Sequence, residues 1–187
     1  MAQTIILIGP MGAGKTTVGE RLAERLNLKR VELDEIRWGY YEEIGYSNEV
    51  AKAKHEAGGM AAIIAYWKPF EAHSVARVVE DYHDCVIDLG GGHTVYEDEA
   101  LLEQVKRALE PYPNVVLLLP SADVDETIRV LEGRIPAEVP AENRDWYRQL
   151  NEHFIRHRSN GELAKITIYT EGKTVDETCD EIMGKLK

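Results

Sequence analysis

Residues 9–16 read Gly-Pro-Met-Gly-Ala-Gly-Lys-Thr, which is a complete phosphate-binding loop (P-loop). The apolar, β-branched run Thr4–Ile8 precedes it, and Val18, Leu22 and Leu26 follow at helical spacing. The loop therefore lies between a predicted buried strand and the N-terminus of a predicted helix, where backbone N–H groups can bind phosphate. A chance glycine-rich turn would lack this context. The sequence predicts a nucleoside triphosphate site and a fold built from strand–loop–helix units.

Each part of this loop has a predicted role. The glycines let the backbone curl so that its N–H groups point inward. The lysine places a positive charge at the β- and γ-phosphates, and the threonine that follows it can ligate Mg²⁺. We expect ATP, with Mg²⁺, to be bound by Gly9, Met11, Gly12, Ala13, Gly14, Lys15, Thr16 and Thr17.

The rest of the chain alternates strand-like and helix-like segments. Strands are predicted near residues 3–8, 29–33, 84–89, 114–119 and 165–169, and helices near 15–27, 34–56, 60–82, 97–109, 123–132, 144–158 and 174–186. Gly58-Gly59 is a natural break before the third helix. This alternation predicts an α/β fold of the P-loop kinase type, a three-layer sandwich with a five-stranded parallel sheet. We expect one domain over residues 1–187, with ligands bound beyond the carboxyl ends of the strands.

Composition excludes several classes of partner. The chain has 187 residues and a formal net charge of −11, without a Lys/Arg cluster, which argues against nucleic-acid binding. The apolar run Ile5–Ile8 is too short to span a membrane. Cys85 and Cys179 show no metal-ligand spacing, so buried free thiols in a reducing cytosol are expected. We expect a cytoplasmic protein that binds a small-molecule acceptor and is a monomer or a weak homo-oligomer.

Acidic residues and glycines follow two of the predicted strands. Glu32 and Asp34 come after the second strand, where one carboxylate can hold Mg²⁺ through water and the other can accept a hydrogen bond from a substrate hydroxyl. Asp34 is also a good helix N-cap, and the two interpretations are compatible. Asp88 ends an apolar strand as in a Walker B element, which orders Mg²⁺ or the P-loop threonine. Gly90-Gly91-Gly92 lets a ligand approach the backbone closely, and a flexible turn is the alternative. His93, the next residue, is interpreted as a polar turn residue.

An irregular stretch, Glu132–Asn143, contains Gly133, Pro136 and Pro140. It predicts a lid over about residues 132–145, and an ordinary surface loop is the alternative. Arg134, at its start, is the best candidate for a cation that closes over the phosphates.

These motifs together resemble the shikimate kinases, which are small P-loop kinases of the nucleoside monophosphate kinase structural class. The resemblance rests on Ile6–Gly19, Glu32-Leu33-Asp34 and Gly90-Gly91-Gly92. It implies that Glu32 replaces an Asp associated with Mg²⁺, that Asp34 binds the substrate, and that the three glycines do so too. It also implies an anionic acceptor and a helical acceptor-binding region over about 34–82.

The resemblance has departures at the acceptor site. Trp67-Lys68-Pro69-Phe70-Glu71 corresponds to the family motif Phe-Arg-x-x-Glu, so Lys68 would replace the arginine that grips the substrate carboxylate. Pro69 should kink this helix. Arg156 corresponds to a second substrate arginine, with Arg158 as its alternative. The stretch before Trp67 is longer than the family implies. Its aromatic residues either enclose a larger or less polar acceptor or are core or half-exposed packing residues: Trp38, Tyr40, Tyr41 and Tyr46.

We therefore predict an ATP-dependent phosphotransferase acting on a hydroxyl of a small metabolite, with Lys15, Asp34 and Arg134 in catalysis. Lys68, Gly90, Gly91, Gly92 and Arg156 would bind the acceptor with Asp34, and Thr16, Glu32 and Asp88 would serve the metal. Shikimate is the leading acceptor by resemblance. A kinase of nucleosides, nucleotides or drug-like alcohols is the alternative, followed by a non-catalytic ATP-binding switch.

Overall fold

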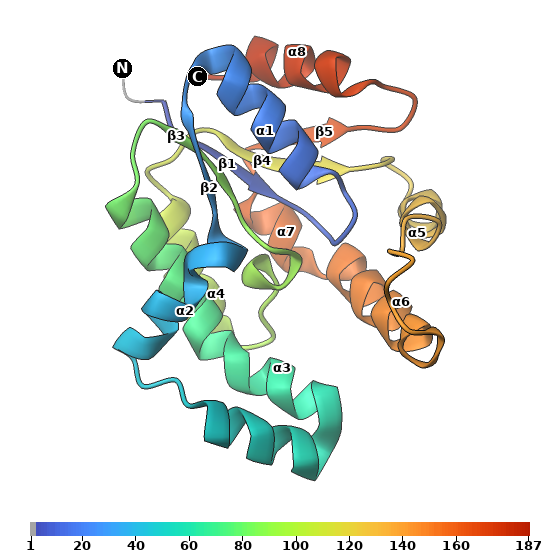
Figure 1. The fold of residues 1–187 in the computed structure, drawn as a ribbon. Coiled ribbons are helices and arrows are strands. Elements are labelled where there is room, and N and C mark those ends of the chain that lie inside the picture. Colours follow the sequence, from blue (N-terminus) through green and yellow to red (C-terminus); the bar gives the residue numbers. More distant parts are fainter. Residues whose placement is uncertain (1–2) are drawn as a thin grey trace.

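A five-stranded, all-parallel sheet forms the centre of the computed structural model, which describes residues 3–187 (Figure 1). The strands lie in the order β2–β3–β1–β4–β5. Their bounds are β1 Ile5–Ile8, β2 Lys29–Glu32, β3 Cys85–Asp88, β4 Val115–Leu119 and β5 Ile166–Tyr169. The α/β class and the five parallel strands are confirmed.

Helices cover both faces of this sheet (Figure 1). They are α1 Lys15–Leu26, α2 Leu33–Glu43, α3 Asn48–Asp81, α4 Glu99–Leu109, α5 Val124–Glu132, α6 Ala141–Arg156, α7 Arg158–Leu163 and α8 Val175–Lys185, with a short 3₁₀ helix η1 at Gly91–Thr94. Between residues 3 and 187, no helix is long and apolar enough to cross a membrane.

Alternation along the central strand divides the core into two layers. Ile5 and Leu7 of β1 pack with residues of α1 and α8, whereas Ile6 and Ile8 pack with α3, α4 and α7. All four residues are fully buried, as expected for a parallel strand with helices on both faces. The buried strand directs the loop that follows it to the carboxyl edge of the sheet.

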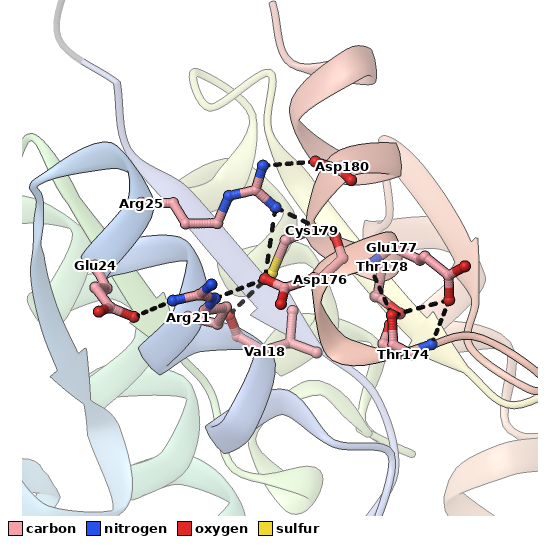
Figure 2. Close-up of polar contacts among 10 residues, drawn as sticks. All are labelled: Val18, Arg21, Glu24, Arg25, Thr174, Asp176, Glu177, Thr178, Cys179 and Asp180. Atoms are coloured by element: carbon pink, nitrogen blue, oxygen red, sulfur yellow. Dashed lines mark hydrogen bonds and ion pairs between the residues drawn. The ribbon is translucent and has the colours of Figure 1, made fainter.

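The α1 and α8 helices pack side by side on one face (Figure 2). The buried Cys179 thiol donates to the Val18 carbonyl at 3.8 Å, and burial raises its pKa. Arg21 and Arg25 pair with Asp176 and Asp180, but such exposed pairs contribute little to stability. Cys85 and Cys179 are both free and buried, as predicted. This half of the sandwich supports α1 and therefore the loop at its N-terminus.

Two of the predicted helices have different bounds in the structure. The helix expected over 34–56 is two helices, because α2 ends at Glu43 and Ser47 caps α3 after a turn with Gly45 at φ 82°. The helix expected over 144–158 ends at Arg156, because the extended residue His157 begins a new cap for α7.

The break at Gly58-Gly59 is confirmed, since both residues leave helical geometry inside the long α3 segment. By contrast, no residue near Pro69 has non-helical dihedral angles. The proline therefore does not interrupt the helix, and Lys68 is carried on a regular helical turn.

Candidate active site

The P-loop connects β1 to α1 at the carboxyl edge of the sheet. Gly9, with φ 138°, lies so close to β4 that a Cβ atom would be 2.5 Å from the Leu118 carbonyl oxygen. Only glycine fits both that backbone angle and that contact. The first backbone bond of α1 runs from the Val18 N–H to the Gly14 carbonyl, and no side chain caps the helix. Its first N–H groups therefore have no helical acceptor and suit an anion.

Lys15 is buried within this loop. Its ammonium donates to the carbonyls of Gly9 and Pro10, both at 3.0 Å. Burial lowers the pKa of Lys15, and the nearby Asp88 and Asp34 carboxylates oppose that shift. The cation is held where the loop curls, which is the position that a triphosphate needs.

Thr16 and Asp88 meet at the base of the loop. The Thr16 hydroxyl donates to the Asp88 carboxylate at 3.1 Å, and burial raises the pKa of Asp88 while Lys15 opposes the shift. Glu32 lies beside Asp88 across β2 and β3, but its carboxylate is engaged by Arg30 at 2.6 Å. Within residues 3–187, no three His, Cys, Asp or Glu side chains form a metal site. These residues fit a Mg²⁺ ion carried by a triphosphate and ligated by Thr16, with Asp88 orienting the threonine.

Asp34 lies in the first turn of α2. The N-cap of this helix is Glu32 and its first residue is Leu33, so the N-cap interpretation of Asp34 is wrong. The Asp34 carboxylate accepts from Arg37 at 2.9 Å. A Cβ atom on Gly90 would lie 2.4 Å from the Asp34 Oδ2 atom. The first glycine of the triplet therefore makes room for the carboxylate.

The other two glycines begin η1 rather than a flexible turn. Lys68 donates to the Gly92 carbonyl at 2.8 Å and to the Glu71 carboxylate at 2.6 Å. A Cβ atom on Gly92 would lie 3.0 Å from Glu71, so this position also favours a small residue. Lys68, Glu71, Gly91 and Gly92 thus come together at one side of the site, as the resemblance implied.

His93 is a site residue that the sequence analysis interpreted only as part of a turn. It is 1% exposed, and neither ring nitrogen has a hydrogen-bond partner. Its Nδ1 atom lies 3.9 Å from Asp34 Oδ1. Burial lowers the pKa of His93 to about 4, so the ring is neutral near pH 7. Its place directly after three glycines was the available signal.

A pocket of about 230 Å³ joins these groups, and we call it the acceptor pocket. It is lined by Met11, Asp34, Arg37, Met60, Ile64, Trp67, Lys68, Glu71, Gly91, Gly92, His93, Trp146, Leu150 and Phe154. Met11 belongs to the P-loop and Asp34 to α2. The pocket therefore adjoins the phosphate site.

Neither Arg156 nor its alternative Arg158 lines this pocket. Arg156 pairs with Asp125 and Glu152, both at 2.8 Å, and Arg158 pairs with Glu99 and Glu162. Phe154 lines the pocket instead. A step of two residues turns a helical side chain by about 200°, so Phe154 and Arg156 lie on opposite faces of α6. The structure therefore does not place Arg156 at the acceptor, where the sequence predicted it.

Two other residues contact the P-loop from the predicted lid region and from α6. Arg134 donates to the Gly12 carbonyl at 3.3 Å. Asn151 of α6 exchanges two hydrogen bonds with the Met11 backbone, at 2.9 and 3.0 Å. Asn151 was missed because an isolated asparagine carries no sequence signal.

The early aromatic residues pack with one another rather than around the acceptor pocket. Tyr41 is fully buried, and Trp38 and Tyr46 contact its ring at 5.3 and 5.6 Å between centroids. Tyr40 is buried in the main core and donates to Asp81. The packing alternative is the one that the structure supports: Tyr40 and Tyr41 lie in the core, and Trp38 is 40% exposed.

Comparisons with known proteins agree with this geometry. The family model "Shikimate kinase" matches residues 11–187. A shikimate kinase of Corynebacterium efficiens is 30% identical over 98% of this chain and 96% of its own length, and one of Streptomyces coelicolor is 31% identical over 94% and 91%. The solved structure of a shikimate kinase from Acinetobacter baumannii in complex with shikimate is 23% identical, with a TM-score of 0.63 over 99% of this chain and 96% of that chain, and has the same fold. The chain therefore belongs to the shikimate kinase family of ATP- and Mg²⁺-dependent phosphotransferases.

Proposed function

We propose that this protein transfers the γ-phosphoryl group of ATP to a hydroxyl group of a small molecule bound at Asp34. The main support is that Met11 of the P-loop and Asp34 line one and the same pocket. An alcohol bound there lies beside the end of a triphosphate bound in the loop. Catalysis then depends on positioning and charge neutralisation.

The chain's own residues divide this work. Lys15 and the first N–H groups of α1 bind the phosphates. Thr16 would ligate the metal, and Asp88 orients the Thr16 hydroxyl. When bound, Mg²⁺ neutralises charge on the β- and γ-phosphate oxygens. Asp34 accepts the hydrogen bond of the acceptor hydroxyl and directs its oxygen toward the phosphate. Arg134, from a lid over about residues 132–145, closes over the transferred group.

Shikimate is the first acceptor to test, because the relatives bear that name. Lys68 lines the acceptor pocket and can meet its carboxylate, to which it offers a point charge rather than the planar fork of an arginine.

The test is a coupled assay of ADP release with ATP, Mg²⁺ and either shikimate, other hydroxylated acids or nucleosides. Asp34→Asn should lower kcat by about 10²- to 10⁴-fold with its best acceptor, because it removes a general base. Its dissociation constant for ATP should stay within about twofold. Asp125→Asn, at an exposed carboxylate on α5, is the matched control and should behave as the wild type.

Two results would contradict the proposal. One is wild-type kcat in Asp34→Asn. The other is tight ATP binding without acceptor-dependent ADP release, which would indicate a non-catalytic switch.

A further inference from the structure

The two oxygens of the Asp34 carboxylate have different surroundings. Arg37 donates from Nη1 to Oδ1 at 2.9 Å, and the His93 Nδ1 atom lies 3.9 Å from the same oxygen. Oδ2 is the atom nearest to the position that a Cβ atom on Gly90 would take. Oδ1 therefore faces the protein's own donors, and Oδ2 is the oxygen beside the glycine triplet.

Two tryptophan rings hold the guanidinium of Arg37. It lies 4.6 Å from the ring centroid of Trp38 and 5.7 Å from that of Trp67, and both distances are within the range of a cation–π contact. Trp38 belongs to α2 and Trp67 to α3, and the two ring centroids are 6.4 Å apart. An arginine on an open helix surface has many rotamers available, whereas contacts from two helices restrict this one. Arg37 can therefore hold Oδ1 in one fixed direction.

Folding stability does not explain this ion pair. The side chain of Arg37 is 21% exposed and that of Asp34 is 47% exposed, and pairs as accessible as this contribute little. The Arg37 Nε atom is buried, and it has no hydrogen-bond partner within residues 3–187. A buried donor without an acceptor lowers stability, so it calls for another explanation. Both side chains line the acceptor pocket, which is where that explanation lies.

A general base needs an orienting partner. It must present a lone pair to the acceptor hydroxyl within hydrogen-bond reach, and a small misplacement lowers the rate strongly. A half-exposed carboxylate that rotates freely would meet this requirement only part of the time. A charge-assisted hydrogen bond from Arg37 fixes the carboxylate more firmly than a neutral donor can. The ring of His93 is neutral near pH 7 and cannot supply that charge.

We propose that Arg37 is a positioning residue for Asp34, and that it holds Oδ1 so that Oδ2 faces the acceptor hydroxyl. The inference rests on the proposed function and adds to its site a residue that lies outside every sequence motif described above. The alternative is an ordinary ion pair between residues three apart on a helix surface.

Arg37→Ala tests the proposal in the ADP-release assay with ATP, Mg²⁺ and shikimate. The kcat should fall by about 10- to 100-fold, because the base loses its orientation, while the KM values for ATP and shikimate stay within about threefold. Added ethylguanidinium replaces the deleted group and should restore kcat, whereas sodium chloride at the same ionic strength should not. Wild-type kcat, or a raised KM for shikimate with kcat unchanged, would overturn the inference.

Arg37→Met is a second variant that keeps the length of the side chain and its packing against the rings. Because it also lacks the donor, its kcat should fall as in Arg37→Ala, and its urea midpoint should stay near that of the wild type. Arg129→Ala is the matched control, because Arg129 forms an exposed ion pair with Glu126 at the same spacing on α5, at 3.1 Å. It should keep the wild-type kcat. An equal loss of kcat in Arg129→Ala would refute a specific role for Arg37.

A double variant shows whether Arg37 acts through Asp34. In Asp34→Asn the base is already missing, so the addition of Arg37→Ala should change kcat by less than about twofold. Losses that multiply in the double variant would show that Arg37 acts independently of Asp34 and would refute the proposal.

The two proposals fail in different ways. Loss of kcat in Asp34→Asn but not in Arg37→Ala removes the positioning role and leaves the phosphotransferase. If the wild type releases no ADP with any acceptor, the proposed function itself is wrong.

Discussion

Lowering the pH from 7 to 5 is expected to destabilise this protein through His93. Burial lowers the pKa of the ring from 6.5 to about 4; Asp34 opposes the shift, and Arg37 and Lys68 add to it. Between these two values the unfolded chain binds a proton that the folded chain does not bind. The contribution of the neutral His93 ring to the free energy of unfolding is therefore fully present above pH 6.5 and is lost as the pH falls from 6.5 toward 4.

The size of the effect follows from the same two pKa values. At pH 5 the solution is roughly 1.5 pH units below the unfolded pKa, and each unit corresponds to about 1.36 kcal/mol. The free energy of unfolding should therefore fall by about 2 kcal/mol from this residue alone.

Urea unfolding at pH 7, 6 and 5 measures this fall in the free energy of unfolding, and His93→Gln is the variant that lacks the titrating ring. The difference in unfolding free energy between wild type and His93→Gln should change by about 2 kcal/mol in favour of the variant between pH 7 and 5. Other groups, including the buried Asp88 carboxyl, are present in both proteins and cancel in the difference.

His55→Gln, at an exposed histidine on α3, should follow the wild type at every pH. A difference that does not change with pH would refute the reasoning. So would an NMR titration of the His93 ring with its midpoint near pH 6.5.

Two further predictions concern the site itself. Lys15→Ala should lower kcat by about 10²- to 10³-fold in the ADP-release assay with little change in the urea midpoint, because the cation serves the phosphates; near-wild-type turnover would contradict the P-loop assignment. Gly90→Ala should raise the acceptor KM by about tenfold, since its Cβ atom would meet the Asp34 carboxylate at 2.4 Å and displace it. Gly161→Ala, which has open space around it, is the control, and an unchanged acceptor KM in Gly90→Ala would show that Asp34 does not hold the acceptor.

The sequence by itself determined the phosphate site and the class of fold. A P-loop acts through the backbone of eight contiguous residues, so its order along the chain already contains its geometry. The placement of Asp34, Asp88 and Gly90–Gly92 was also predictable, because each follows a strand and parallel strands end at one edge of the sheet. These features depend on local spacing and on one topological rule.

Only the tertiary structure decided what surrounds the acceptor. Phe154 and Arg156 are two residues apart on α6, and which of them faces the pocket depends on how that helix packs against α5 and η1. Asn151 holds Met11 from 140 positions away along the chain, and His93 of η1 lies 3.9 Å from Asp34 of α2 only in the folded protein. Side-chain direction on a packed helix changes by about 100° with each residue, so a small error in alignment moves a side chain to another face.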